Sequence, residues 1–130
     1  MQILLITSKL DPIVIPKKLE KFDAVAVRTG VIMSIEELRL ADYLAKQAFT
    51  NKKNIANKFK YEFLLWLAGK RDIKSAIEET NPNENTFIVI VFSGDADHIL
   101  EVIDAKKLEL KIKKDAEPSS IEKIALSRLK

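Results

Sequence analysis

The sequence predicts an α+β fold, with a small, mostly antiparallel or mixed sheet of about four strands packed with helices, in a single domain over residues 1–130. The 130 residues are 47% hydrophobic, which is enough to fill one core without disulfides or metal. Four short stretches have the patterns of strands, and three consecutive helical patterns separate the second from the third. Because three helices in a row break a strand–helix alternation, a Rossmann or flavodoxin winding is not expected.

The first part of the chain predicts two strands joined by a short helix. Residues 3–6 form a continuous apolar run that is typical of a buried strand. Pro16 suits the first turn of a short helix. Residues 24–27 predict the second strand, which stops near Gly30.

The middle of the chain predicts three helices. Ser34 and Glu37 form a capping box, so a helix should begin there, and it should end near residues 50–51. A second helix is predicted from Asn54, and Gly69 is placed to end it. Its apolar stripe should be Ile55, Phe59, Phe63, Trp66 and Leu67, which recur at helical spacing.

The remaining elements follow from local signals. Asp72 can cap a third helix that stops at residues 81–82. Residues 87–92 are apolar at every position, which predicts a central strand with both faces covered. Asp95 should cap a further helix. Residues 108–112 alternate apolar and charged side chains, as a one-sided edge strand does. Pro118 should open the last helix.

Composition excludes several classes of chemistry. The chain has no cysteine, so thiol chemistry and cysteine-bound metal are excluded, and three glycines cannot build a glycine-rich phosphate loop. No cluster of His, Asp and Glu residues has the sequence spacing of a metal-binding motif. We therefore expect no metal, no cofactor and no catalytic residue. No segment resembles a signal peptide or a membrane span, which predicts a cytoplasmic protein without membrane contact. Eighteen lysines against four arginines, with sixteen isoleucines, favour a thermophilic source.

His98 is the one side chain that keeps an enzyme among the alternatives. It lies in Gly94-Asp95-Ala96-Asp97-His98, where a predicted strand gives way to a helix. A carboxylate–histidine pair at such a junction could act as a general base. The simpler interpretation is that Asp95 caps the helix, Asp97 favours its first turn and His98 lies at the surface.

Positive charge is concentrated in the middle of the chain. Residues 46–74 contain eight basic and two acidic side chains, although the whole chain has a net charge of only +3. Such a segment is either a solvated helical face or a surface that binds phosphate. Lys60, Lys70, Arg71 and Lys74 are the candidate cations, and Arg71 is the sharpest because its planar guanidinium can bind phosphate or stack on a base. Tyr61 could offer a stacking face.

The segment EFLLWLAGKRDIKSAI, residues 62–77, resembles the family of the small non-catalytic subunit of the KEOPS complex, known as PRPK-binding protein in animals. In that family an acidic residue opens an apolar helix, a small turn with a basic residue follows, and an Ile-x-x-Ala helix comes next. The matching positions are Glu62, Leu64, Leu67, Ala68, Gly69, Arg71, Ile73 and Ala76. Asp72 stands where the family is expected to have an amide, and Trp66 where it more often has Tyr.

The resemblance implies an accessory subunit of the complex that installs threonylcarbamoyladenosine on tRNA. Such a subunit binds the small atypical kinase of the complex, through it the threonylcarbamoyl transferase subunit, and the single-stranded 3′ acceptor end of tRNA. Lys60, Lys70, Arg71 and Lys74 would then contact the RNA, with Arg28 and Gly30 as neighbours at a strand end. The last helix, with Ile121, Ile124 and Leu129, would contribute to the kinase surface, although a core role for these three residues is equally consistent. The alternative is a purely structural adaptor that activates the kinase without binding RNA.

Overall fold

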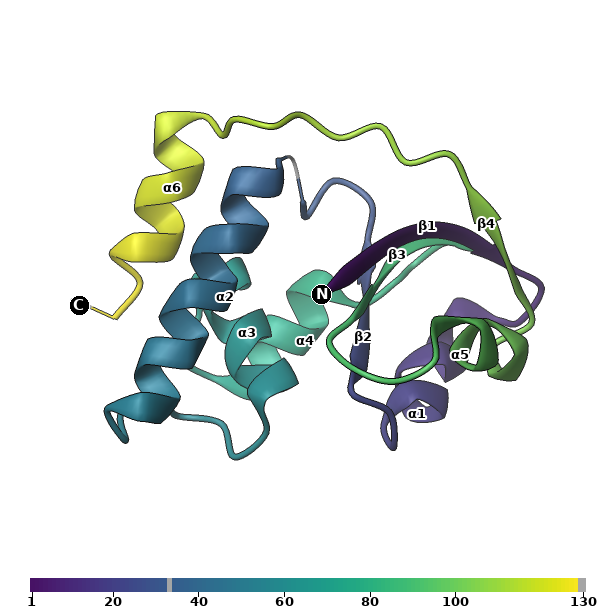
Figure 1. The fold of residues 1–130 in the computed structure, drawn as a ribbon, viewed down its shortest axis with the longest axis horizontal. Coiled ribbons are helices and arrows are strands. Elements are labelled where there is room, and N and C mark those ends of the chain that lie inside the picture. The colour runs from purple at the N-terminus through teal and green to yellow at the C-terminus, as the bar shows by residue number, and fades with distance from the viewer. Residues whose placement is uncertain (33, 129–130) are drawn as a thin grey trace. The chain divides into compact units, whose positions relative to one another are not determined.

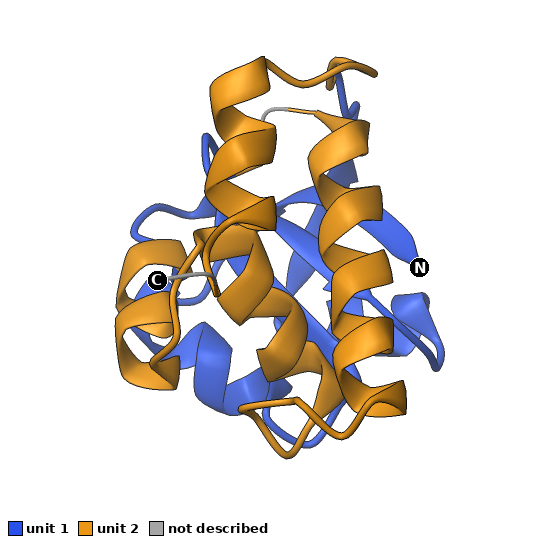
Figure 2. Cartoon of the chain, turned by 90° about the vertical axis from the view of Figure 1, so that its left-hand side faces the viewer, with its two compact units in different colours: residues 1–31, 81–111 blue, residues 32–80, 112–130 orange. Residues whose placement is uncertain are grey.

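The computed structural model describes residues 1–32 and 34–128, and within them it contains one four-stranded antiparallel sheet and six α-helices (Figure 1). The predicted α+β class is therefore confirmed. The chain divides into two compact units, each built from two separate segments (Figure 2). Unit 1 comprises residues 1–31 and 81–111, and unit 2 comprises residues 32–80 and 112–130. The single domain predicted over residues 1–130 stays a prediction.

Unit 1 contains the whole sheet. Its strands are β1 (Gln2–Ser8), β2 (Ala24–Arg28), β3 (Thr86–Val91) and β4 (Ala105–Leu108), in the order β2-β3-β1-β4. All three pairings are antiparallel. The two inner strands, β1 and β3, are rich in β-branched residues and leucine, the residue types that fit a pleated, buried surface.

Two helices of unit 1 share a core with the sheet. They are α1 (Ile15–Leu19), which follows the 3₁₀ turn η1 (Pro12–Val14), and α5 (Ala96–Val102). Alternate residues of β3 point into this core, which also takes side chains from β1, β2, α1 and α5. Ile88 and Ile90, on the opposite face of β3, are 4% and 0% exposed. Both faces of the strand are covered, as its continuous apolar run predicts.

Unit 2 is helical among its described residues. It consists of α2 (Ile35–Thr50), α3 (Phe59–Ala68), α4 (Ile73–Thr80) and α6 (Pro118–Ala125), and α3 contacts the other three. The predicted capping box is present: the hydroxyl of Ser34 accepts the N–H of Glu37 at 3.2 Å and donates to its carboxylate at 2.8 Å. Trp66, expected in the core, is 9% exposed.

Two element boundaries differ from the prediction. The predicted helix from Asn54 begins only at Phe59, and Ile55, expected in its buried stripe, is 43% exposed. The reason is that the backbone N–H groups of Ile55 and Ala56 donate to the carboxylate of Glu62, which holds this segment as a loop.

The predicted edge strand over residues 108–112 is also wrong in position. The observed strand is β4, which pairs with β1 from Ala105 to Leu108. Beyond it the chain leaves the sheet and enters unit 2, where the carbonyl of Lys113 accepts the N–H of Ile35 at 2.8 Å.

Candidate nucleic-acid interface

Of the candidate cations, Lys70 and Arg71 lie in the turn between α3 and α4, residues 69–72. Gly69 ends α3 in the left-handed conformation, with φ 67° and ψ 36°. Its N–H donates to the carbonyl of Trp66 at 3.1 Å, and the N–H of Lys70 donates to that of Leu65 at 2.9 Å. Any residue other than glycine would adopt this left-handed conformation at a steric cost, because its Cβ crowds the backbone. The glycine therefore fixes where Lys70 and Arg71 leave the helix.

Asp72 caps the helix that follows. Its Oδ2 accepts the N–H of Ser75 at 3.0 Å and its hydroxyl at 2.7 Å. These hydrogen bonds from Ser75, with the charge of Lys74 a smaller contribution, lower the pKa of the Asp72 carboxyl. The carboxylate therefore already occupies the N–H of Ser75 in the first turn of α4, as the predicted cap requires. Phosphate binding at this turn has to rely on side chains.

Lys70 shares an acidic partner with the last helix. Its Nζ lies 3.4 Å from Oε2 of Glu79, and Nζ of Lys123 lies 3.1 Å from Oε1 of the same carboxylate. Partial burial acts to raise the pKa of Glu79, but the two ammonium groups outweigh it and the pKa is lowered. The three charges sum to +1, and all three side chains are more than a third exposed. The group remains a weakly positive surface.

Arg71 and Lys74 are the exposed cations of the turn. Arg71 lies in the turn itself, and Lys74 lies in the first turn of α4. With Lys70 they place three cationic side chains within five consecutive residues, beside one carboxylate that serves as a helix cap. Side chains of this type can neutralise two or three successive phosphates of a flexible strand. The turn is the part of the predicted site that the structure brings together.

Lys60 does not belong to this surface. It is 4% exposed, and its Nζ lies 5.2 Å from the ring centroid of Tyr61. A buried ammonium cannot reach a phosphate in this conformation, so the prediction that Lys60 binds RNA is not carried further. Tyr61 is itself half-buried, and its ring already contacts this cation.

Arg28 and Gly30 lie in unit 1, at the end of β2 and in the turn after it. Nε of Arg28 donates to the carbonyl of Asn81 at 2.8 Å, so this side chain supports the chain where it enters β3. Gly30 is exposed, with φ 91° and no atom within 4 Å of where a Cβ would stand. Both residues therefore have evident structural roles in unit 1.

The predicted partner residues of the last helix divide into three cases. Ile124 is 1% exposed and belongs to the interior, so its proposed contact with a partner is withdrawn. Ile121 is half-buried. Leu129 lies outside the described residues. Leu126, just after α6, is 46% exposed and was not predicted.

A buried acid organises unit 2. The side chain of Glu62 is 0% exposed, and its Oε2 lies 2.6 Å from Nη2 of Arg128. Oε1 accepts the N–H groups of Ile55 and Ala56 at 2.9 and 3.0 Å, and Oε2 accepts the indole N–H of Trp66 at 3.1 Å. The guanidinium of Arg128 also lies over the Trp66 ring, 4.2 Å from its centroid. Sequence reasoning recognised Glu62 but missed Arg128, because sixty-six positions separate them and no local pattern links them.

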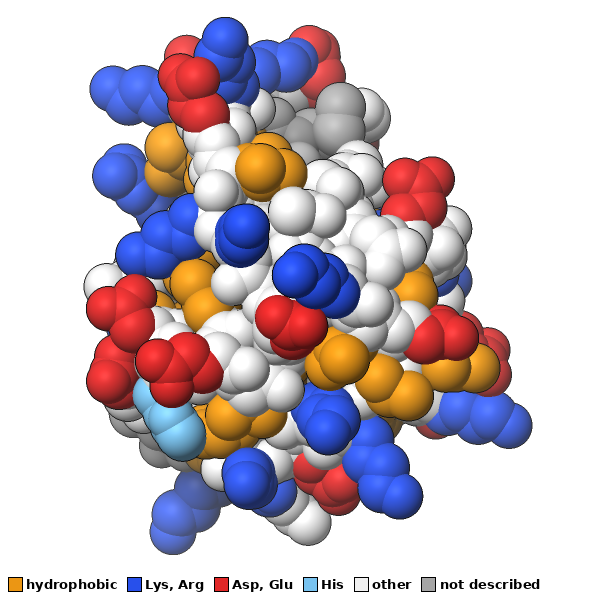
Figure 3. Space-filling model, turned by 90° about the vertical axis from the view of Figure 1, so that its right-hand side faces the viewer, with side chains coloured by type: hydrophobic (Ala, Val, Ile, Leu, Met, Phe, Trp, Pro, Cys, Tyr) orange, Lys and Arg blue, Asp and Glu red, His pale blue; other side chains and the backbone are white. Residues whose placement is uncertain are grey.

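The alternative catalytic site has the features of ordinary surface structure. Asp95 caps α5 by accepting the N–H of Asp97 at 3.0 Å, as predicted. Asp97 pairs with Lys107 at 3.5 Å, and His98 meets the ring of Phe22 edge-on at 5.7 Å. Figure 3 shows the histidine at the surface beside acidic side chains. Among residues 1–32 and 34–128, no cluster of three potential metal ligands is found, and no helix is long and apolar enough to cross a membrane.

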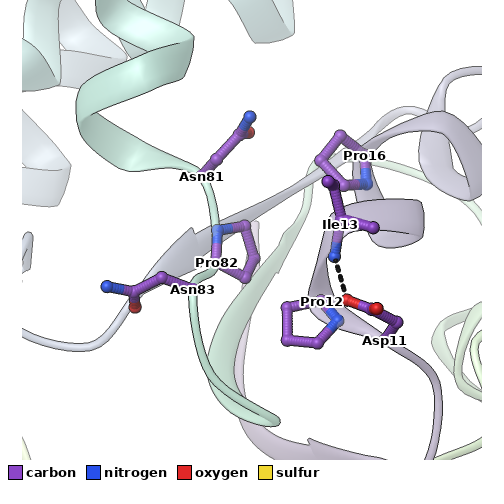
Figure 4. A pocket seen from close by; sticks show the side chains of 7 residues that line it. All are labelled: Asp11, Pro12, Ile13, Pro16, Asn81, Pro82 and Asn83. Carbon is purple, nitrogen blue, oxygen red and sulfur yellow. Dashed lines mark hydrogen bonds between the residues drawn. The ribbon is translucent and has the colours of Figure 1, made fainter.

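Unit 1 carries a pocket of about 310 Å³ beside the 3₁₀ turn (Figure 4). In it the side chain of Asp11 accepts the N–H of Ile13 at 3.0 Å, and Ile13 is itself 80% exposed. Its lining is Asp11, Pro12, Ile13, Pro16, Asn81, Pro82 and Asn83. Because no lysine or arginine is among them, this pocket lacks the cations that phosphate binding needs.

Comparisons with known proteins leave the family open. No protein-family model matches the chain, and no curated protein matches it significantly.

Proposed function

We propose that the chain is a non-catalytic RNA-binding subunit of the KEOPS tRNA-modification complex, and that it holds the single-stranded 3′ acceptor end of tRNA while binding the atypical kinase subunit. The observation that carries the RNA part is the turn between α3 and α4, where Lys70, Arg71 and Lys74 are accessible around a glycine-fixed bend. The resemblance over residues 62–77 supports the assignment to this complex.

The chemistry of the turn fits a flexible strand better than a rigid duplex. A single strand needs its phosphates neutralised and a base stacked or enclosed. The turn supplies cations on side chains that can follow the strand, and its guanidinium can stack on a base. Because Asp72 closes the end of α4, the turn contacts the strand through Lys70, Arg71 and Lys74.

Exchange of Arg71 for Glu tests this proposal. We expect Arg71→Glu to remove most tRNA binding, to leave binding to the kinase unchanged and to change the melting temperature little, because the side chain is exposed. Arg39→Glu is the matched control, since Arg39 is an exposed arginine on α2, away from the turn in sequence. Equal loss of tRNA binding in both variants contradicts a role for the turn.

One observation favours the adaptor function as a second candidate. The region around α6 has an exposed apolar residue, Leu126, beside a hollow of about 370 Å³. The lining of this hollow is Gly69, Ser119, Glu122, Lys123, Leu126 and Ser127. A kinase that docks here would be bound even when the basic turn is neutralised. Leu126→Asp should then weaken kinase binding and spare tRNA binding.

A further inference from the structure

A small pocket lies in unit 2 at the C-terminal end of α2, away from the basic turn in the sequence. Its volume is about 180 Å³. Leu44 and Ala48 provide apolar walls, and the amides of Gln47 and Asn51 and the cations of Lys53 and Arg128 provide polar groups. The complete lining is Leu44, Gln47, Ala48, Asn51, Lys53, Trp66 and Arg128. An apolar hollow with a few convergent polar groups is the usual form of a ligand site.

The volume and the lining of the pocket suit a ligand with a single flat ring system. Sites for whole small molecules usually measure about 300 to 1,000 Å³, so 180 Å³ has room for a ring system but not for a complete nucleotide. The guanidinium carbon of Arg128 lies over the Trp66 ring, 4.2 Å from its centroid, and both residues line the pocket. Indole and guanidinium planes are the surfaces on which unpaired bases stack in RNA-binding proteins.

An unsatisfied donor of Arg128 points to a ligand with acceptor atoms. Nε and Nη2 of Arg128 are buried and make no hydrogen bond within the described structure. Nη2 is paired with the carboxylate of Glu62 at 2.6 Å, which leaves Nε as the donor without a partner. Buried donors without an acceptor are rare, and Nε of Arg128 is such a donor in a residue that lines the pocket. The ring nitrogens and carbonyl oxygens of a nucleobase are acceptors of the required kind.

The loop that borders the pocket is held in place by hydrogen bonds and carries cations. The N–H of Lys53 donates to the carbonyl of Ala48 at 2.8 Å, with Lys52 in the left-handed conformation at φ 56°. Farther along, Glu62 holds the backbone of Ile55 and Ala56. Lys52 and Lys53 are exposed. A base in the pocket would therefore leave its phosphate near two ammonium groups, and little chain ordering would be needed on binding.

We infer that this pocket receives one unpaired nucleobase of the RNA, with the adjoining phosphate against Lys52 and Lys53. The inference rests on the proposed function and deepens it, because it adds a base-binding position to the phosphate-binding turn. It also assigns binding roles to Asn51, Lys53 and Arg128, none of which the sequence analysis placed in the interface.

The chain has a built-in probe for this inference, because Trp66 is its only tryptophan and lines the pocket. Intact tRNA, the same tRNA without its last nucleotide, and tRNA trimmed of all unpaired 3′ nucleotides would be titrated while binding and indole fluorescence are recorded. We expect intact tRNA to change the fluorescence of Trp66, and removal of the last nucleotide to weaken binding about tenfold and abolish the fluorescence change.

Surface variants separate the pocket from the rest of the interface without disturbing the core. In the Asn51→Ala and Lys53→Ala variants, the ratio of the affinity for intact tRNA to that for tRNA without its last nucleotide should fall from about ten to about one. Lys58→Ala is the matched control: it removes an exposed lysine that does not line the pocket and should leave the ratio unchanged. Binding that depends on the 3′ end, with an unchanged Trp66 signal and an unchanged ratio in both pocket variants, overturns this inference alone. Equal binding of intact and fully trimmed tRNA overturns the proposed function as well.

Discussion

The carboxylate of Glu62 lies 2.6 Å from the guanidinium of Arg128, which joins α3 to the segment that follows α6. The side chains are 0% and 13% exposed, so water screens this pair little. The same carboxylate holds the loop before α3 and the indole of Trp66. The ion pair therefore connects both chain segments of unit 2 to the walls of the proposed base pocket.

Removal of Arg128 should destabilise the protein. Arg128→Ala leaves a buried carboxylate without its charged partner, which costs about 3 kcal/mol and lowers the melting temperature by roughly 10 °C. Thermal unfolding followed by circular dichroism measures this decrease in melting temperature. Lys46→Ala is the control, because Lys46 pairs with Asp42 on the surface at 2.8 Å and such pairs contribute less than about 1 kcal/mol. An Arg128→Ala protein as stable as the control contradicts the importance of the pair.

Gly69→Ala should destabilise the protein for two separable reasons. The left-handed backbone costs a non-glycine residue about 1 kcal/mol. In addition, a Cβ at this position would stand 2.9 Å from Cγ and 3.1 Å from the carbonyl oxygen of Lys123. Lys123→Ala removes the first of these contacts, so the cost of Gly69→Ala should fall in that background. Denaturant unfolding of the two single variants and the double variant measures the coupling, and strict additivity contradicts the contact.

Stability should fall in acid partly because of Glu79. Its pKa is lowered in the folded protein, since Lys123 and Lys70 outweigh the effect of burial. A group with a lowered folded pKa contributes stability above its ordinary pKa of 4.5, and this contribution is lost as the pH falls through the folded value. Glu79→Gln should therefore flatten the decline of the unfolding free energy below about pH 5. Lys70→Ala and Lys123→Ala together should flatten the same region, and an unchanged decline contradicts the assignment.

The salt dependence of tRNA binding should report the contribution of Lys74. If Lys74 neutralises one phosphate of a single strand, Lys74→Gln reduces the log–log slope of affinity against salt by about 0.7. Arg39→Gln on α2 removes a charge outside the turn and should leave the slope unchanged. Affinities measured between about 50 and 200 mM salt give the slope. If Lys74→Gln and Arg39→Gln have the same slope, a contact between Lys74 and a phosphate is contradicted.

Elements with local signals were predicted well. The capping box at Ser34, the glycine end at Gly69 and the caps at Asp72 and Asp95 all occur as the sequence indicates. Each of these depends on side chains within three residues of the groups they serve, so the sequence alone contains the information. The apolar run of β3 likewise predicted a strand covered on both faces.

Features set by distant contacts were missed. The loop before α3 replaces a predicted helical turn because Glu62 takes the N–H groups of Ile55 and Ala56. Residues 109–112 alternate as a strand would, but the chain there passes into unit 2 instead of extending β4. Charge patterning placed Lys60 on the surface, although it is 4% exposed. Composition counts charges without their burial, and burial decides which of them can bind phosphate.

The most direct test of the central proposal is a competition between two unlabelled tRNAs for the protein bound to labelled intact tRNA. One competitor is intact, and the other lacks all of its unpaired 3′ nucleotides. If the turn between α3 and α4 holds the acceptor end, the trimmed competitor should displace the label at least about tenfold less well. Equal displacement by the two competitors contradicts acceptor-end binding by this protein.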